Sequence, residues 1–303
     1  MDMSVVVPVY GSGQFLPGLL KSLLNQDYRG EYEIIIVDDG STDGTEDVVK
    51  GIKAKNLFYI KQENSGPASA RNRGIKNSRG RIITFTDGDC IPDRRWLSEI
   101  KKSFTEGVDG VEGKVETLGK IYPDSHFIKN NSGNMFLTSN VSYLRSAVIA
   151  GFDRRYKYPN REDSDIAFRL ISRGKNIIFS EKAVVRHRLL KSSLKCMLKR
   201  KLYFQSDILL FKKYPELYRG KIKFPFERFT PVYVIFVLGG FLNNLAWSGL
   251  LVSALAEIVY RKYSFSTVSF IKFLVAQAIG SFLNIFAVLR GCLRYKVNPA
   301  RLL

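Results

Sequence analysis

The stretch MSVVVPVY (residues 3–10) sets the fold class, because it is a short β-branched apolar run that predicts a buried strand. EIIIVDD (residues 33–39) repeats the pattern, and segments with helical periodicity separate such runs from one another. Apolar strands that alternate with helices are typical of a parallel sheet covered on both faces. We therefore predict an α/β, Rossmann-like, mostly parallel sheet with helices on both faces. The predicted strands span residues 3–10, 33–38, 57–61, 81–86, 110–116, 134–143, 176–179 and 183–187, and the predicted helices span 14–25, 46–53, 68–77 and 162–173.

Acidic residues follow two of these strands. An aspartate pair ends the second strand at residues 38–39, and Asp87-Gly88-Asp89 follows the fourth. Ligands bind beyond the carboxyl ends of the strands in such sheets. We expect Asp87 and Asp89 to bind Mg²⁺ or Mn²⁺, which would bridge to a diphosphate; the alternative is a helix cap and turn. The chain has no Walker loop and no complete dinucleotide-binding glycine pattern.

Charge is unevenly distributed along the chain. The formal net charge is +19, of which residues 1–185 contribute +3 and residues 186–303 contribute +16. Residues 229–256 form an uncharged run of 28 residues, and residues 273–289 form one of 17. Because a hydrocarbon core is ~30 Å thick, we expect two transmembrane helices, at about 230–256 and 268–289. The alternative is a buried hairpin of soluble helices.

The segment before the first apolar run is strongly basic. Residues 186–228 hold 13 basic and 3 acidic side chains, with apolar residues between them at helical spacing. This pattern predicts an amphipathic helix in the headgroup region. The chain shows no nucleic-acid-binding motif, and we expect no nucleic-acid partner. The positive-inside rule then places the N-terminal domain in the cytoplasm of a multi-pass cell-membrane protein. The predicted domains are residues 1–187, 188–228 and 229–303.

A series of motifs over residues 3–175 resembles family 2 glycosyltransferases of the GT-A fold. The motifs are VVVPVY (5–10), EIIIVDDGSTD (33–43), GPASARNRGI (66–75), DGD (87–89), GFD (151–153) and REDSD (161–165). The resemblance implies that Pro8 and Tyr10 line the base pocket and that Asp39 accepts a hydrogen bond from the base, which favours uridine. It implies that Arg71 lies near the base and diphosphate.

The resemblance also implies a metal site and a pair of catalytic acids. Asp87 would lie by the ribose and metal, Asp89 would bind the metal, and His187 would complete the site. Asp163 would be the general base that deprotonates the acceptor hydroxyl, and Glu162 would bind the acceptor or orient Asp163. Since Asp163 opens a predicted helix, we expect the helix N-terminus to lower its pKa.

The predicted function is inverting, metal-dependent transfer of a single sugar from a nucleotide sugar, favoured as a UDP sugar, to a lipid-borne acceptor at the cytoplasmic membrane face. Single transfer is favoured because the Gln-x-x-Arg-Trp signature of processive synthases is absent. Transfer to polyprenyl phosphate itself is the alternative. Nucleotidyl transfer and a non-catalytic membrane adaptor are the rival classes. The oligomeric state is left open.

Overall fold

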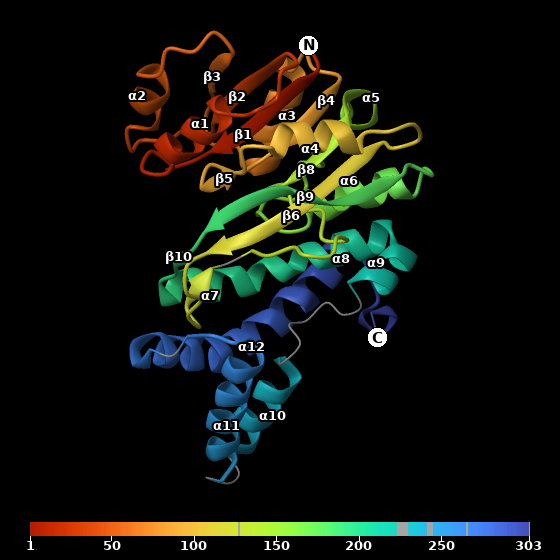
Figure 1. Cartoon of the computed structure of the whole chain (residues 1–303). Helices are drawn as coiled ribbons and strands as arrows, with labels where there is room; N and C mark the ends of the chain where they lie inside the picture. The colour runs from red at the N-terminus through yellow and green to blue at the C-terminus, as the bar shows by residue number, and fades with distance from the viewer. Residues whose placement is uncertain (127, 223–229, 241–244, 265, 303) are drawn as a thin grey trace. The chain divides into compact units, whose positions relative to one another are not determined.

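A computed structural model describes residues 1–126, 128–222, 230–240, 245–264 and 266–302. The chain forms two compact units. Unit 1 comprises residues 1–118 and 128–188, and unit 2 comprises residues 119–127 and 189–303. Unit 1 contains the predicted sheet, and unit 2 is mainly helical (Figure 1).

Within the described residues, unit 1 is built on an eight-stranded sheet of order β3-β2-β1-β4-β8-β6-β9-β5. The first four strands in this order are parallel, as predicted, because helices connect them. The other half is mixed: β8 is antiparallel to both β4 and β6, β9 is parallel to β6, and β5 is antiparallel to β9. The bounds are β1 Met3–Val9, β2 Tyr32–Asp38, β3 Leu57–Lys61, β4 Ile82–Phe85, β5 Cys90–Pro92, β6 Gly110–Leu118, β8 Val141–Leu144 and β9 Ile177–Arg188.

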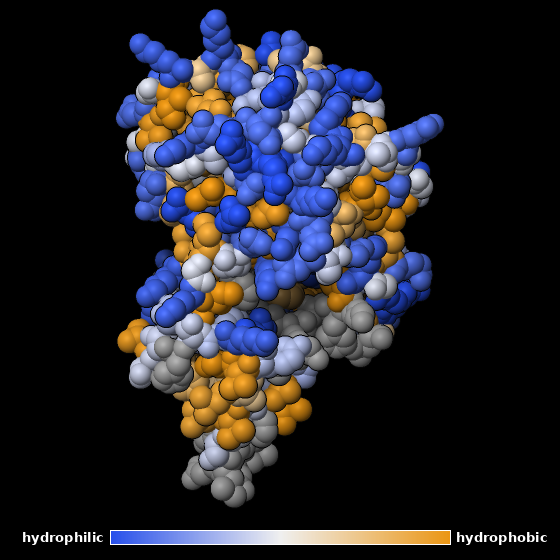
Figure 2. Space-filling model, in the orientation of Figure 1, coloured by the Kyte–Doolittle hydropathy of each residue, from blue (hydrophilic) through white to orange (hydrophobic). Residues whose placement is uncertain are grey.

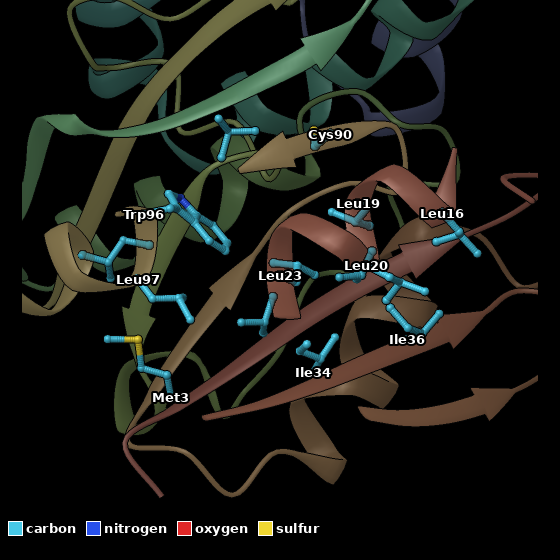
Figure 3. Packing of buried hydrophobic residues seen from close by; sticks show 14 of the residues in the cluster. Met3, Leu16, Leu19, Leu20, Leu23, Ile34, Ile36, Cys90, Trp96 and Leu97 are labelled. Atoms are coloured by element: carbon cyan, nitrogen blue, oxygen red, sulfur yellow. The ribbon is translucent and has the colours of Figure 1, made fainter. Parts of the chain in front are cut away.

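Helices cover both faces of this sheet. Successive side chains of a strand point to opposite faces, so the apolar strands present side chains that must be buried on each face. Val5 and Val7 of β1 pack with α1 and α4 in one core cluster, which Figure 3 shows from close by. Val6 points to the other face and packs with α3, α5 and α6. Trp96 anchors the first cluster and is fully buried. The helices are α1 Leu16–Leu24, α2 Thr45–Lys50, α3 Pro67–Asn77, α4 Trp96–Ser103, α5 Arg145–Val148 and α6 Glu162–Ile171.

In unit 2, short helices replace the single interfacial helix predicted over residues 188–228. A continuous helical stretch runs through α7, η1 and α8 and ends at Tyr214, where Pro215 starts α9. Proline cannot continue a preceding helix, because it lacks the backbone donor and clashes with the previous turn. Two short strands, β7 and β10, pair antiparallel beside this stretch. The bounds are β7 Ser125–His126, β10 Leu190–Lys191, α7 Leu194–Lys201, η1 Leu202–Phe204, α8 Gln205–Lys213 and α9 Pro215–Lys221.

The first of the two predicted transmembrane helices is not a single helix in the structure. The region predicted as one helix over about 230–256 holds two, α10 (Thr230–Gly240) and α11 (Leu245–Tyr260), which pack against each other. Gly239 and Gly240 end the described part of α10, and glycine has low helix propensity; residues 241–244, on which the prediction also falls, lie outside the described residues. Among the described residues, one helix is long and apolar enough to cross a membrane, α12 (Thr267–Tyr295). It includes the second predicted span. A short 3₁₀ turn, η2 (Pro299–Arg301), follows.

Candidate active site

The sheet brings three of the predicted motifs to one edge. β1 lies between β2 and β4, and all three run in the same direction. Val9 pairs with Asp38, so Tyr10 and Asp39 follow strands that end side by side, and Asp87 follows β4 at the same edge. Tyr10 is 63% exposed, so its ring is available to a ligand, whereas Pro8 is partly buried within β1.

Asp39 organises the loop that leads into α3. Its Oδ1 accepts hydrogen bonds from Gln62 Nε2 (2.7 Å) and from the Ser65 backbone N–H (2.9 Å). Its Oδ2 accepts from the Gly66 N–H at 2.8 Å. The side chain is buried, and a carboxylate has about four acceptor positions. One acceptor position therefore remains for a base, and Asp39 also fixes the loop before Arg71.

Arg71 connects the nucleotide side of the site to the predicted acid pair. It projects from α3, is 4% exposed, and lies between two carboxylates that are distant in sequence. Its Nη1 donates to Glu162 Oε1 at 3.0 Å, and its Nη2 donates to Asp87 Oδ1 at 3.2 Å. One buried guanidinium thus holds residues from three separate motifs in a single cluster.

At the start of α6, Glu162 is buried and Asp163 is partly buried. Burial raises the pKa of Glu162 to about 7, the Asp163 charge adds to the rise, and Arg71 opposes it. Burial also raises the pKa of Asp163, although its Oδ1 accepts from the Ser164 N–H at 2.7 Å. The expectation that the helix N-terminus lowers the pKa of Asp163 is therefore wrong, because desolvation outweighs the favourable backbone contact. A carboxyl with a raised pKa is a stronger base when ionised.

The predicted metal ligands also lie together. His187 Nε2 is 3.4 Å from Asp89 Oδ1, and ligand atoms of Asp87, Cys90 and His187 lie within 4.8 Å of one another. His187 Nδ1 lies 2.9 Å from the Arg188 carbonyl, which can only accept, so the proton sits on Nδ1. In the neutral imidazole with this tautomer, Nε2 can bind a metal beside the Asp89 carboxylate. An imidazole nitrogen with two carboxylates nearby fits Mn²⁺ or Mg²⁺.

Sequence reasoning missed two residues at this site. Cys90 lies among the predicted metal ligands, and burial raises the pKa of its thiol well above the usual value, so the thiol is neutral when no metal ion is bound. Arg161 precedes the acid pair with φ +73°, a left-handed conformation that is rare for a residue with a side chain. Its positive charge lowers the pKa of Asp163, against the effect of burial. The only available sequence signal was the position of each residue beside a motif.

The GFD motif supports α3 from outside the metal site. The Asn72 side chain donates to the Phe152 carbonyl (2.9 Å) and accepts from the Phe152 N–H (2.6 Å). The Arg71 guanidinium lies over the Phe152 ring, 5.7 Å from its centroid. Gly151 has φ +71°, and a Cβ there would lie 2.4 Å from Asn72 Oδ1. Glycine is therefore required at this position, and the motif holds Arg71 in place.

Comparisons with known proteins identify the family of the chain. The family model described as "Glycosyl transferase family 2" matches residues 4–162, more than half of the chain. Glycosyltransferase AglE of Haloferax volcanii is 38% identical over 119 residues, covering 38% of this chain and 39% of the relative. The poly(ribitol-phosphate) beta-N-acetylglucosaminyltransferase TarP of Staphylococcus aureus is 32% identical over 163 residues, covering 50% and 49%. The chain thus aligns with less than half the length of these curated relatives.

Solved structures show the same fold over most of the chain. The mannosyltransferase PcManGT from Pyrobaculum calidifontis, in complex with GDP-Man and Mn²⁺, superposes with a TM-score of 0.64 at 20% identity. That superposition covers 93% of this chain and 87% of the other. S. aureus TarS 1-349 in complex with UDP-GlcNAc gives a TM-score of 0.59 at 18% identity, covering 98% and 92%. At these identities the likeness is one of fold.

Proposed function

This chain belongs to glycosyl transferase family 2, and we propose that it is an inverting, metal-dependent enzyme that moves one sugar from a nucleotide sugar to a lipid-borne acceptor. The observation that carries this proposal is the buried Arg71, which joins Asp87 of the nucleotide side to Glu162 of the acid pair. A donor site and a proton acceptor in one cluster are what direct displacement at an anomeric carbon requires.

The donor is bound at the edge formed by β1, β2 and β4. The exposed Tyr10 ring and Pro8 form the wall against which the base packs, and Asp39 accepts a hydrogen bond from the base. This acceptor favours the imide N–H of uracil, so we favour a UDP sugar. The titles of the structural neighbours name both UDP-GlcNAc and GDP-Man, so both are suitable first donors.

Asp87, Asp89 and His187 are the residues that hold the divalent ion. When bound, Mg²⁺ or Mn²⁺ offsets the charge that develops on the departing diphosphate. Asp163 takes the proton from the acceptor hydroxyl as that oxygen attacks the anomeric carbon. Arg71 holds Glu162, whose pKa burial raises to about 7, and burial raises the pKa of Asp163 as well. Direct attack from the face opposite the diphosphate inverts the anomeric configuration.

The acceptor is proposed to be lipid-borne because unit 2 combines basic helices with exposed apolar ones. We propose that unit 1 is the catalytic domain predicted over residues 1–187 and that it faces the cytoplasm. Extension of a lipid-linked sugar is favoured over transfer to polyprenyl phosphate, because a phosphate acceptor is already ionised and needs no base such as Asp163. Nucleotidyl transfer would instead release pyrophosphate.

The test is a panel of nucleotide sugars with Mn²⁺, offered with polyprenyl phosphate or with membrane lipid extract. Nucleoside diphosphate should form with one donor and only with lipid extract. Asp89→Ala and Asp163→Ala should both abolish it, whereas Glu63→Gln, an exposed glutamate in the same unit, should not. Full activity of Asp163→Ala toward a sugar acceptor would refute the assigned base, and activity on polyprenyl phosphate alone would favour the alternative acceptor.

A further inference from the structure

The apolar helices α10 and α11 form an antiparallel hairpin in unit 2. Tyr233, near the start of α10, donates its hydroxyl to Glu257 Oε2, near the end of α11, at 2.7 Å. Val237, Leu250 and Ala254 pack in the same cluster. The start of α10 and the end of α11 therefore lie at the same end of the hairpin, and Figure 1 shows the two helices side by side.

The described parts of the two hairpin helices are shorter than the hydrocarbon core of a bilayer. At ~1.5 Å per residue, α10 and α11, of 11 and 16 residues, measure roughly 16 and 24 Å, against a hydrocarbon core of ~30 Å. No charged residue occurs between positions 229 and 256. On the face that Figure 2 draws, apolar side chains predominate on the described part of the hairpin. Those that are exposed are Ile235, Leu238, Leu251, Val252, Leu255 and Val259. These dimensions suit insertion into one leaflet.

The long helix α12 is covered along one side by the basic stretch α7–η1–α8. Lys201 Nζ of α7 donates to Gln277 Oε1 at 2.8 Å, and the Lys201 stem lies against Gly280. At the other end, Lys212 Nζ of α8 donates to the Tyr295 carbonyl at 2.8 Å. If α12 crossed the bilayer, these helices would carry their lysines and arginine into hydrocarbon, which costs several kcal/mol for each charge. The basic residues of α7 and α8 are Lys195, Lys199, Arg200, Lys201, Lys212 and Lys213.

The two sides of α12 differ in polarity. The side against α7 and α8 buries Gln277, Ser281 and Asn284. The opposite side exposes a stripe of apolar residues along the whole helix, namely Val268, Ile271, Ile279, Phe282, Phe286, Leu289 and Leu293. A helix in the plane of the interface turns one apolar face toward the acyl chains, and the exposed stripe of α12 provides such a face.

The turn between α11 and α12 is held at the base of the hairpin. The Ser264 N–H donates to the Ile121 carbonyl at 2.6 Å, and Lys272 Nζ lies 3.3 Å from Asp124 Oδ2. Both partners belong to residues 119–127, a short segment whose two ends continue into unit 1. Such a segment cannot reach across a bilayer and return. Ser264 and Lys262 therefore lie on the same side of the membrane as unit 1, whereas a two-span topology places them on the opposite side.

We infer that the chain is monotopic: the α10–α11 hairpin dips into one leaflet, and α7, α8 and α12 lie in the interface with the α12 stripe toward the acyl chains. The surrounding lysines and arginines contact anionic headgroups. This inference rests on the membrane attachment in the proposed function and specifies its geometry. An interfacial attachment lets a lipid-borne acceptor arrive by lateral diffusion within the leaflet that the enzyme occupies.

Cysteine labelling in intact cells and inside-out vesicles tests the inference. The full chain carries Cys196→Ser, which removes the exposed native thiol and leaves Cys90 and Cys292 buried. Lys262→Cys is compared with Lys199→Cys, an exposed α7 position that lies on the side of unit 1 in either topology. Both variants should release nucleoside diphosphate like wild type, so that labelling is read on folded enzyme.

Both cysteines should react with an impermeant maleimide from the same side, at rates within a few-fold of each other. Reaction of Lys262→Cys only from the side opposite Lys199→Cys would overturn the inference and leave the proposed function intact. Recovery of active wild-type chain entirely in the soluble fraction would overturn both the inference and the proposed membrane attachment.

Discussion

Replacing Glu162 by glutamine is expected to stabilise unit 1 at neutral pH while it impairs turnover. Burial, aided by the Asp163 charge, raises the pKa of Glu162 from 4.5 to about 7 despite the ion pair with Arg71. At ~1.4 kcal/mol per pKa unit, this shift corresponds to a cost of about 3 kcal/mol for the ionised form. Because the folded carboxyl binds its proton more tightly than the unfolded one, the cost is absent below about pH 4.5 and complete above about pH 7.

The difference in free energy of unfolding between Glu162→Gln and wild type should therefore grow with pH. It should be near its minimum at pH 4.5 and rise by up to about 3 kcal/mol at pH 8. Urea unfolding of the full chain, in detergent with EDTA, measures this difference in free energy. All variants carry Trp247→Phe, so that the fluorescence of the buried Trp96 reports on the unfolding of unit 1 alone. Glu63→Gln, at an exposed position, is the matched control and should show no comparable rise. A difference that does not change with pH, or that falls with pH, would refute the reasoning.

Three other perturbations have defined outcomes. Asp163→Asn should lower kcat by about 10²-fold or more while calorimetry shows unchanged donor binding, because only the proton acceptor is lost; weakened donor binding would argue against that role. Asp89→Asn should weaken Mn²⁺ binding, measured by electron paramagnetic resonance, at least about tenfold, since even outer partners of metal sites contribute that much. Gly151→Ala should destabilise unit 1 by about 1–3 kcal/mol in thermal unfolding, because the new Cβ meets Asn72 Oδ1 in a left-handed backbone; wild-type stability would contradict this.

The parallel half of the sheet could be predicted because each of its strands is a short apolar run that can be recognised from neighbouring residues alone. Residues 5–9 and 34–37 are apolar throughout, and both lie in strands with nearly the predicted bounds. In the mixed half, strands were predicted where β6, β8 and β9 lie, but their order and direction could not be predicted, because the pairing of β8 between β4 and β6 depends on contacts distant in sequence. The first predicted transmembrane helix was ended at residue 256, because the next residue, Glu257, is charged. In the structure, however, α11 continues past Glu257, whose buried carboxylate accepts a hydrogen bond from Tyr233. Hydropathy alone cannot show that a carboxylate has such a partner.

The candidate site could be predicted as a set of residues but not as an arrangement. The motifs named Arg71, Asp87 and Glu162, but only the fold shows that one guanidinium contacts both carboxylates. The pKa direction of Asp163 was missed because a helix N-terminus is visible in sequence, whereas burial is not. Cys90 was missed because its role depends on the pairing of β5 with β9, which places it opposite His187.

Phosphorus NMR of the full chain, incubated with a nucleotide sugar, Mn²⁺ and membrane lipid extract, tests sugar transfer most directly. Nucleoside diphosphate should accumulate, with the sugar recovered in the lipid fraction, and Asp163→Asn should abolish both signals. Release of pyrophosphate, or an intact donor across the whole panel of nucleotide sugars, would contradict glycosyl transfer by this site.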